Sequence, residues 1–414
     1  MDYEKIRIKL EEDLGNELYQ TMHGDIVSNL LKEAKIEKIE NEWKFMLEGH
    51  SFKVNKSLAP RLASLFEEVQ KTLEFEEPID FYVTNSSQVN AFSISRLEDD
   101  EVHIINFNSE LVERLDDEEL RFVIGHEIGH LISRNAHITK LIQFIFPDPQ
   151  RMPLILTHKI TLWRKLSELT ADRYGFIASP SLEKTASGFF KLSSGLDSKR
   201  INFDFRAYLE ENDKILEFFR KESSTNLLSH PINPIRIKAV QLFSDSATYR
   251  SVSESRPVET DEKLDKEVND LIEILLTLSS SELDHYRKHF IAAAGIIMSN
   301  LDEKMTQPEY ENIIKTLSQF TIFPKLFLEE VHKQGKPDEV LANAAQNIVK
   351  LNPGERYTLF EFMVGMALTD RQLFKQEISF LYNVGENFFG FPRKEIAQII
   401  SNMINQTFMP NIYS

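Results

Sequence analysis

The residues with the clearest chemical potential form the pattern His126-Glu127-Ile128-Gly129-His130. On a helix the two histidines are four residues apart and share a face, so both imidazoles can reach one zinc ion. Glu127 lies beside them, where it can take a proton from a water bound to that ion. The chain has no cysteine, so any metal site must use His, Asp or Glu. The pattern therefore predicts a catalytic zinc site.

A helix is expected to begin shortly before this pattern, because Asp116 and Glu119 have the spacing of a capping box. A chance pattern on a helix surface is the alternative. The surrounding residues are apolar, however, and two unpaired histidines with a glutamate would be costly to bury among them. Gly129 costs about 1 kcal/mol relative to alanine in mid-helix, which indicates that another backbone or a ligand passes close to it.

A catalytic zinc site also needs a third protein ligand. A metzincin would place a glycine three residues after His130 and a histidine three residues later, but this sequence has serine and alanine there. The gluzincin pattern has a glutamate on a second helix, followed four residues later by an aspartate. The helix expected over Leu162 to Phe176 contains both. Glu168 is therefore predicted as the third ligand, and Asp172 as the residue that fixes the tautomer of a ligand histidine; an exposed acidic helix face is the alternative.

Several motifs occur in the order found in the HtpX-like and CAAX-prenyl-protease-like zinc metallopeptidases, and the sequence resembles that family over roughly residues 55–245. The motifs are Asn90-Ala91-Phe92, the strand Val102 to Phe107, Leu115 to Leu120, His126 to His130, Glu168 to Asp172, Ser229-His230-Pro231 and Arg236-Ile237. The resemblance implies a gluzincin endopeptidase with a small sheet, an active-site helix and a second ligand helix. It also implies one Zn²⁺ per chain.

The same resemblance implies that His230 lies near the metal. There it would donate to the oxyanion or ligate zinc in a resting state, and a structural role before Pro231 is the alternative. Arg236 is a rival oxyanion donor, although packing at a helix start is the favoured interpretation. His103 and His137 have no spacing argument, and both are expected to be structural or exposed.

The elements that must position these residues follow from periodicity and turn residues. Glu42 to Val54 alternates like a β-hairpin, and Ser57 to Phe75 reads as a helix. Leu141 to Leu162 is apolar but broken by prolines, so it is expected to be a loop packed on the core; a cap over the cleft or a surface touching substrate or membrane is the alternative. Three short strands are expected at Ile79–Thr84, Val89–Ser95 and Val102–Phe107, with the last as the sheet edge that binds the peptide.

The second half of the chain contains an internal repeat. Asp302 precedes Glu309 by the same number of residues as Asp370 precedes Glu377. Each repeat reads as a helix, an acidic turn and a second helix. This resembles the TerB-like all-α domain, in which such acids can bind a divalent cation. A capping aspartate before an acidic helix start is the alternative. A regulatory or partner-binding role is expected for this half.

The expected fold is therefore α+β and mostly α, in four parts. These are an N-terminal helical extension and hairpin at 1–54, the metallopeptidase domain at 55–245, a Ser-rich linker at 246–262 and the all-helical domain at 263–414.

The charge and hydropathy of the chain bound its partners and location. A net charge of −17 without a basic stripe argues against nucleic acid. The chain has neither a signal peptide pattern nor an apolar run long enough to span a membrane, so a cytoplasmic protein without a transmembrane span is expected. The predicted function is a soluble zinc endopeptidase acting on a protein or peptide, with Glu127 as general base. The alternative is a stress-linked scaffold that keeps the peptidase fold for recognition.

Overall fold

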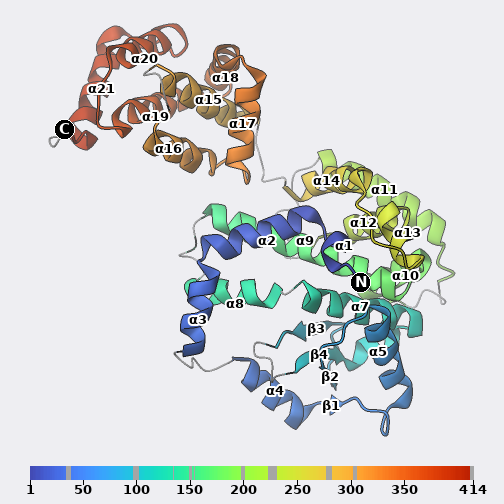
Figure 1. The fold of residues 1–414 in the computed structure, drawn as a ribbon. Coiled ribbons are helices and arrows are strands. Elements are labelled where there is room, and N and C mark those ends of the chain that lie inside the picture. The colour runs from blue at the N-terminus through green and yellow to red at the C-terminus, as the bar shows by residue number, and fades with distance from the viewer. Residues whose placement is uncertain are drawn as a thin grey trace. The chain divides into compact units, whose positions relative to one another are not determined.

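The computed structural model describes residues 1–33, 39–96, 102–133, 135–148, 152, 154–196, 201–221, 231–276, 282–301 and 305–410. The chain divides into two compact units, Met1–Thr277 and Leu278–Ser414 (Figure 1). The first unit combines helices with one small sheet and the second is helical throughout its described residues, as the α+β, mostly α class predicted. Among the described helices, none combines the length and apolar composition that a membrane span requires.

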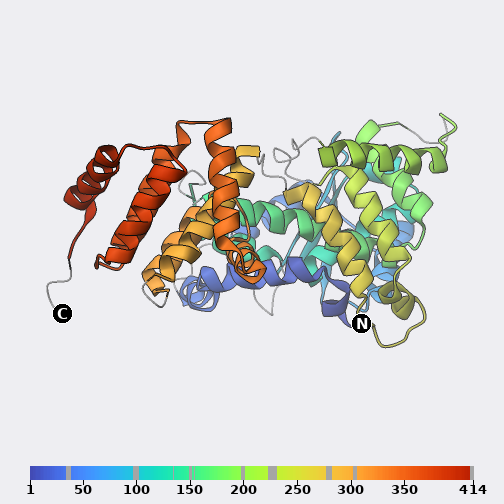
Figure 2. The ribbon, with the colours of Figure 1, turned by 90° about the horizontal axis from the view of Figure 1, so that it is seen from above.

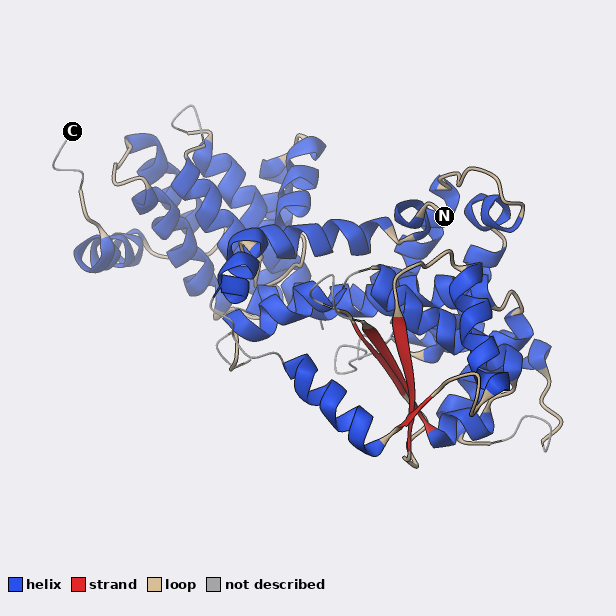
Figure 3. Cartoon of the chain, turned by 60° about the horizontal axis from the view of Figure 1, so that its bottom comes forward, coloured by secondary structure: helices blue, strands red, loops and turns tan. Residues whose placement is uncertain are grey.

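The first unit is built on a four-stranded mixed sheet (Figure 3). Its strands are β1 (Phe52–Lys53), β2 (Ile79–Thr84), β3 (Ala91–Ile94) and β4 (His103–Asn108). The order is β1-β2-β4-β3, with β2 parallel to β4 and the other two pairs antiparallel. The three strands predicted after residue 78 are confirmed, but the predicted edge is wrong. Because β4 pairs with β2 on one side and β3 on the other, its backbone hydrogen bonds are used within the sheet, and β1 and β3 are the edge strands among the described residues.

The predicted hairpin over Glu42–Val54 is also wrong. Its first half belongs to helix α4 (Ile39–His50), and only β1 is extended, pairing with β2 through Phe52 opposite Val83. The buried Leu47 packs against the sheet while Phe45 is 85% exposed. Two faces of such different exposure fit a helix lying on a sheet, and an alternation over only five residues does not distinguish this from a strand.

The N-terminal helices α1 (Tyr3–Ile6) and α2 (Lys9–Thr21) form part of the first unit's core, followed by α3 (Gly24–Glu33). α1 and α2 pack on the long helix α9 (Leu154–Ala178), where Arg173 Nη1 donates to the carbonyl oxygen of Ile6 at 2.8 Å. Tyr174 Oη donates to the carbonyl oxygen of Tyr3 at 3.0 Å. The segment expected as an extension is therefore held against the predicted ligand helix.

Besides α1 to α4, the described residues of the first unit form ten helices. They are α5 (Pro60–Thr72), α6 (Ser109–Arg114), α7 (Asp117–Ile132), α8 (Asn135–Ile145), α9, α10 (Leu182–Ser194), α11 (Phe205–Lys221), α12 (Asn233–Ser244), α13 (Ala247–Ser253) and α14 (Glu262–Leu276). The stretch Leu141–Leu162 is mostly helical in its described part, because α8 runs through Ile145 and α9 starts at Leu154. The expectation of a loop there is wrong.

The expected linker 246–262 is folded as well. Ser246 caps α13 by accepting a hydrogen bond from the amide of Tyr249, and Thr248 Oγ1 donates to the carbonyl oxygen of Glu259 at 2.9 Å. Asp261 then accepts hydrogen bonds from both Ala247 N and Leu264 N. The polar side chains of this segment, whose abundance suggested a linker, form hydrogen bonds with the backbone of the same segment. The boundary between units lies at 277/278 instead of 262/263, because α14 packs on α12 and α9.

The second unit contains seven described helices and no described strand (Figure 2, orange to red). They are α15 (Glu282–Ser299), α16 (Gln307–Leu317), α17 (Pro324–Gln334), α18 (Pro337–Leu351), α19 (Glu355–Thr369), α20 (Lys375–Asn387) and α21 (Arg393–Thr407). The helices α15, α16 and α17 lie in the first of the two predicted repeats, and α19, α20 and α21 lie in the second. Arg287 and Glu355, which are 68 residues apart, bind each other between the repeats, with Nε donating to Oε2 at 3.0 Å.

The described acids of the predicted second cation site accept hydrogen bonds from nearby backbone amides. Glu309 accepts a hydrogen bond from Thr306 N at 2.7 Å, and Glu377 accepts one from Phe374 N at 3.0 Å, so both carboxylates cap their own helices. Asp370 accepts a hydrogen bond from Gln372 N. Asp302 lies outside the described residues. The two glutamates thus cap the helices, whereas Asp370 lies at the C-terminal end of α19 and is not the capping aspartate of the alternative; cation binding stays a prediction.

Candidate metal centre

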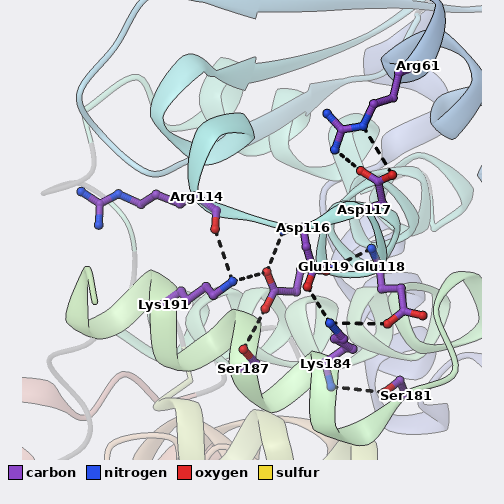
Figure 4. Close-up of polar contacts among 10 residues, drawn as sticks. All are labelled: Arg61, Arg114, Asp116, Asp117, Glu118, Glu119, Ser181, Lys184, Ser187 and Lys191. Atoms are coloured by element: carbon purple, nitrogen blue, oxygen red, sulfur yellow. Dashed lines mark hydrogen bonds and ion pairs between the residues drawn. The ribbon is translucent and has the colours of Figure 1, made fainter. Parts of the chain in front are cut away.

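The start of α7 is fixed by a polar cluster that joins it to α10 (Figure 4). Asp116 accepts hydrogen bonds from Glu118 N and Glu119 N, and Glu119 accepts one from Asp116 N at 2.9 Å, which confirms the capping box. The buried Glu119 carboxylate also binds Lys191 Nζ at 2.7 Å and Ser187 Oγ at 2.8 Å. Because Lys191 and Ser187 belong to α10, these bonds set the position of α7 before it enters the core.

α7 and α9 cross closely because three glycines lie at the contact. A Cβ atom on Gly125 would lie 2.6 Å from Ala178 Cβ, and one on Gly175 would lie 2.8 Å from the carbonyl oxygen of Phe122. A Cβ atom on Gly129 would lie 3.0 Å from Ala171 Cα. The prediction that another backbone passes close to Gly129 is therefore confirmed. This close approach brings the face of α9 that carries Glu168 within reach of the histidines on α7.

Three side chains converge at this crossing in the way a metal ion requires. His126 Nε2 lies 3.1 Å from His130 Nε2 and 3.6 Å from Glu168 Oε2, and His130 Nε2 lies 3.5 Å from Glu168 Oε1. Four ligands at the usual zinc distance of about 2.0–2.1 Å would be about 3.3–3.4 Å apart in a tetrahedron. The spacing of the three atoms therefore fits zinc. Within the described residues, this is the group of three or more His and acidic side chains close enough to hold one ion.

Asp172 lies directly behind His126, one turn after Glu168 on α9. His126 Nδ1–H donates to Asp172 Oδ1 at 2.9 Å, which leaves the Nε2 lone pair facing the other two ligand atoms. Arg236, from α12, donates to the same carboxylate through Nε at 2.8 Å and Nη2 at 2.6 Å. Its guanidinium carbon also lies 4.6 Å from the ring centre of Phe189. Asp172 therefore has both a histidine and a cation as partners.

The charges of this cluster are strongly coupled. Burial raises the pKa of Asp172, but the charge and hydrogen bonds of Arg236, and then His126, outweigh it and hold the pKa below its usual value. Burial lowers the pKa of His130, but the hydrogen bond and charge of Glu168 and the charge of Glu127 outweigh it and raise the pKa. Negative charge around His130 thus favours a cation at this place.

Exposure indicates the side from which the centre opens. The side chain of His130 is 21% exposed, that of Glu168 15% and that of His126 10%, while Asp172 is fully buried. Glu127, next to His126 on α7, is 5% exposed. The ligand side is therefore partly open and the Asp172–Arg236 side is closed, as in a site that keeps one position for a reactant.

The other predicted site residues have varied positions. His230 lies outside the described residues. His103 is buried at the start of β4, with Nε2 2.8 Å from Glu77 Oε2, and His137 is exposed on α8. Arg236 is bound to Asp172, a partnership that sequence reasoning missed. The sequence shows only that an arginine follows the His-Pro pair by five residues, and this spacing does not reveal which acid the arginine binds.

Comparison with known proteins agrees with this geometry. Residues 56–152 match the model of peptidase family M48. The Arabidopsis thaliana protein "Plastoglobule-localized metallopeptidase 48, chloroplastic" is 27% identical over 218 residues, covering 49% of this chain and 62% of that protein. The chain thus spans less than two thirds of this relative's length. No solved structure matches the chain. The matched residues include strands β2 to β4 and the helix with both histidines, so this part of the chain is similar to peptidase family M48.

Proposed function

We propose that this protein is a zinc-dependent endopeptidase in which His126, His130 and Glu168 hold one Zn²⁺. The single observation that carries the proposal is the convergence of these three ligand atoms, with Glu127 buried beside them. A scaffold has no use for a buried base next to a metal centre, so the geometry favours the enzyme over the binding protein.

The roles of the protein groups follow from their positions. Zinc, when bound, would polarise the scissile carbonyl and lower the pKa of a water molecule. A carboxylate oxygen of Glu127 accepts the proton of the attacking water and then passes it to the leaving amine nitrogen. Asp172 keeps the proton of His126 on Nδ1, and Arg236 holds the Asp172 carboxylate in place. His230 is retained in this proposal as a donor to the oxyanion.

The edge of β3 (Ala91–Ile94) opposite β4 is the proposed binding position for the peptide. β3 is the last strand of the sheet, pairs with β4 and packs beside α7. An extended peptide that pairs with β3 would add a strand to the sheet and pass along the active-site helix. Main-chain pairing requires no particular side chain, which fits an endopeptidase acting on unstructured segments.

A substitution at Glu127 tests the proposal. Glu127→Gln keeps the size of the side chain but removes its ability to take a proton, so the variant should retain about one zinc and lose about 10²–10⁴-fold in turnover of an unfolded protein such as casein. Glu118→Gln is the matched control, since Glu118 is on the same helix, 55% exposed and far along it from the histidines. Chelation should abolish the wild-type activity and added zinc should restore it.

Two results would refute the proposal. One is wild-type turnover in Glu127→Gln, which would remove Glu127 from the mechanism. The other is a zinc-loaded wild-type chain that cleaves no unfolded protein or peptide, which would favour the scaffold. The cytoplasmic location and the partner-binding role of the second unit stay predictions; the name of the Arabidopsis relative places that protein in chloroplast plastoglobules.

A further inference from the structure

A second pair of histidines with metal-chelating spacing lies in the second unit. His285 and His289 are four residues apart on α15, the spacing that His126 and His130 have on α7. Their ring centres are 4.4 Å apart, compared with 4.7 Å in the first pair. Residues at this spacing share a helix face. Two imidazoles are thus already side by side, outside the site that the peptidase uses.

Hydrogen bonding fixes the tautomer of His289. Its Nδ1 lies 2.7 Å from the carbonyl oxygen of His285, and since a carbonyl only accepts, Nδ1 must carry the proton. In the neutral ring the lone pair is then on Nε2. Metal-binding histidines have this arrangement, in which the second ring nitrogen donates to a carbonyl or carboxylate and thereby orients the ring.

The surroundings of the pair combine access with an apolar wall. His285 is exposed, so an ion can approach from solvent, while the ring of His289 packs edge-on against Phe327 of α17 at 5.0 Å between centres. Burial, followed by the charges of His289 and Lys288, lowers the pKa of His285. His285 is therefore present as the neutral ring, the form that binds metals, over more of the neutral pH range.

Nearby charges set the electrostatic balance for a dication. Lys288 is unfavourable, but its Nζ lies over the Phe327 ring at 5.0 Å. Glu282, three residues before His285 on the same face, carries a negative charge that acts on that imidazole. Glu330 acts likewise on Lys288. One acid thus acts on His285 and another on Lys288. Imidazole ligands with this environment suit Zn²⁺, Cu²⁺ or Ni²⁺ and do not suit Mg²⁺ or Ca²⁺.

We propose that His285 and His289 form a second site for a divalent transition metal, exposed on α15 and independent of the peptidase centre. Two protein ligands leave the remaining positions to water or to a ligand from another molecule. The site should therefore bind zinc more weakly than the three-ligand centre.

Zinc binding by the full chain tests this site. Wild-type protein already holding one zinc is dialysed against increasing Zn²⁺ and its zinc content is measured by elemental analysis. We expect about one further zinc in wild type and at least a tenfold weaker second event in His285→Gln and in His289→Gln, since each loses one of two ligands. His332→Gln is the matched control, because His332 is an exposed histidine near the end of α17 and should keep the second zinc.

Two further variants separate this site from the first. Glu168→Ala should lose the tight zinc and keep the weaker one, so failure of the peptidase proposal leaves this test intact. His289 packs on Phe327, so circular dichroism must show native helix content in its variant, whereas His285 is exposed and its variant serves alone if the other unfolds. An undiminished second zinc in folded His285→Gln, or no second zinc in wild type up to millimolar Zn²⁺, would overturn the proposal.

Discussion

Replacing Gly129 by alanine adds one methyl group between the helices that carry the proposed metal ligands. The new Cβ atom would lie 2.9 Å from Tyr174 Cδ2 and 3.0 Å from Ala171 Cα, whereas ordinary contacts begin near 3.4 Å. Tyr174 is fully buried and Ala171 Cα is backbone, so neither can turn aside. α7 and α9 must therefore separate by about 0.5 Å or more, which moves Glu168 away from the histidines.

The expected free energies partly cancel, but the effect on activity does not. Alanine is favoured over glycine in a helix by about 1 kcal/mol, while overpacking of a dense core costs about 1–3 kcal/mol. The free energy of unfolding should thus fall by about 0–2 kcal/mol in Gly129→Ala. A misplacement of about 1 Å at a reacting centre can cost about 10²-fold in rate. Turnover should therefore fall by about tenfold to a hundredfold, with weaker zinc binding.

Gly188→Ala is the matched control for this prediction. Gly188 lies within α10, and a Cβ atom there would meet nothing within 4 Å. The same substitution should therefore raise the free energy of unfolding by up to about 1 kcal/mol and leave turnover unchanged. Denaturant unfolding, zinc competition with a chelator and peptide turnover measure the three effects. If Gly129→Ala matches Gly188→Ala in stability and activity, the close helix crossing does not position the ligands.

Three further predictions concern the groups around the site. Arg236→Gln should weaken zinc binding by about 10–100-fold and lower the free energy of unfolding by about 3–5 kcal/mol, because it leaves the buried Asp172 without its cation. Chelator competition would measure the zinc affinity and urea unfolding the stability. A wild-type zinc affinity in this variant would contradict the prediction. Burial raises the pKa of Asp116, but a lysine and backbone amides keep it below its ordinary value, so its stabilisation is present at neutral pH and lost as the pH falls through the folded pKa. Asp116→Ala should thus be about 1 kcal/mol less stable than wild type at pH 7, a deficit that shrinks below about pH 4 in urea titrations, and a pH-independent deficit would refute the reasoning. A chain of residues 1–277 should fold and bind zinc, whereas residues 1–260 should be strongly destabilised because α14 is missing, as thermal unfolding would reveal; equal stability of the two chains would return the boundary to residue 262.

Local chemistry made the elements of the candidate centre predictable from sequence. The capping box at Asp116 and Glu119 depends on residues three apart, and the shared face of His126 and His130 depends on the pitch of one helix. Placing Glu168 beside them needed a family pattern, because no local rule says which of many acidic residues faces another helix. The structure brings the three together, and the glycine at 129 was the one sequence signal that the second helix passes there.

The errors arose where distant partners decide the outcome. Strand β4 could be recognised from its residues. Whether it lies inside the sheet or at the edge, however, depends on its pairing with β2, a strand that is not adjacent to it in the sequence. The alternation that suggested a hairpin near Phe45 was short enough to fit the helix α4. The Ser-rich segment before α14 was read as a linker because composition does not show that Ser246 and Asp261 cap helices.

The match to the family model ends at residue 152, but the candidate metal centre also includes residues that follow it in the sequence. Glu168 and Asp172 lie on α9, and Arg236 lies on α12. On its other side α9 is held by the N-terminal segment, where the carbonyl oxygens of Ile6 and Arg7 accept hydrogen bonds from Arg173. Burial lowers the pKa of Arg173 to about 10, so these carbonyls compensate a cation that has little access to water. Because Arg173 follows Asp172 directly, the helices before residue 22 help to position the candidate metal centre, which therefore depends on residues outside the matched region on both sides.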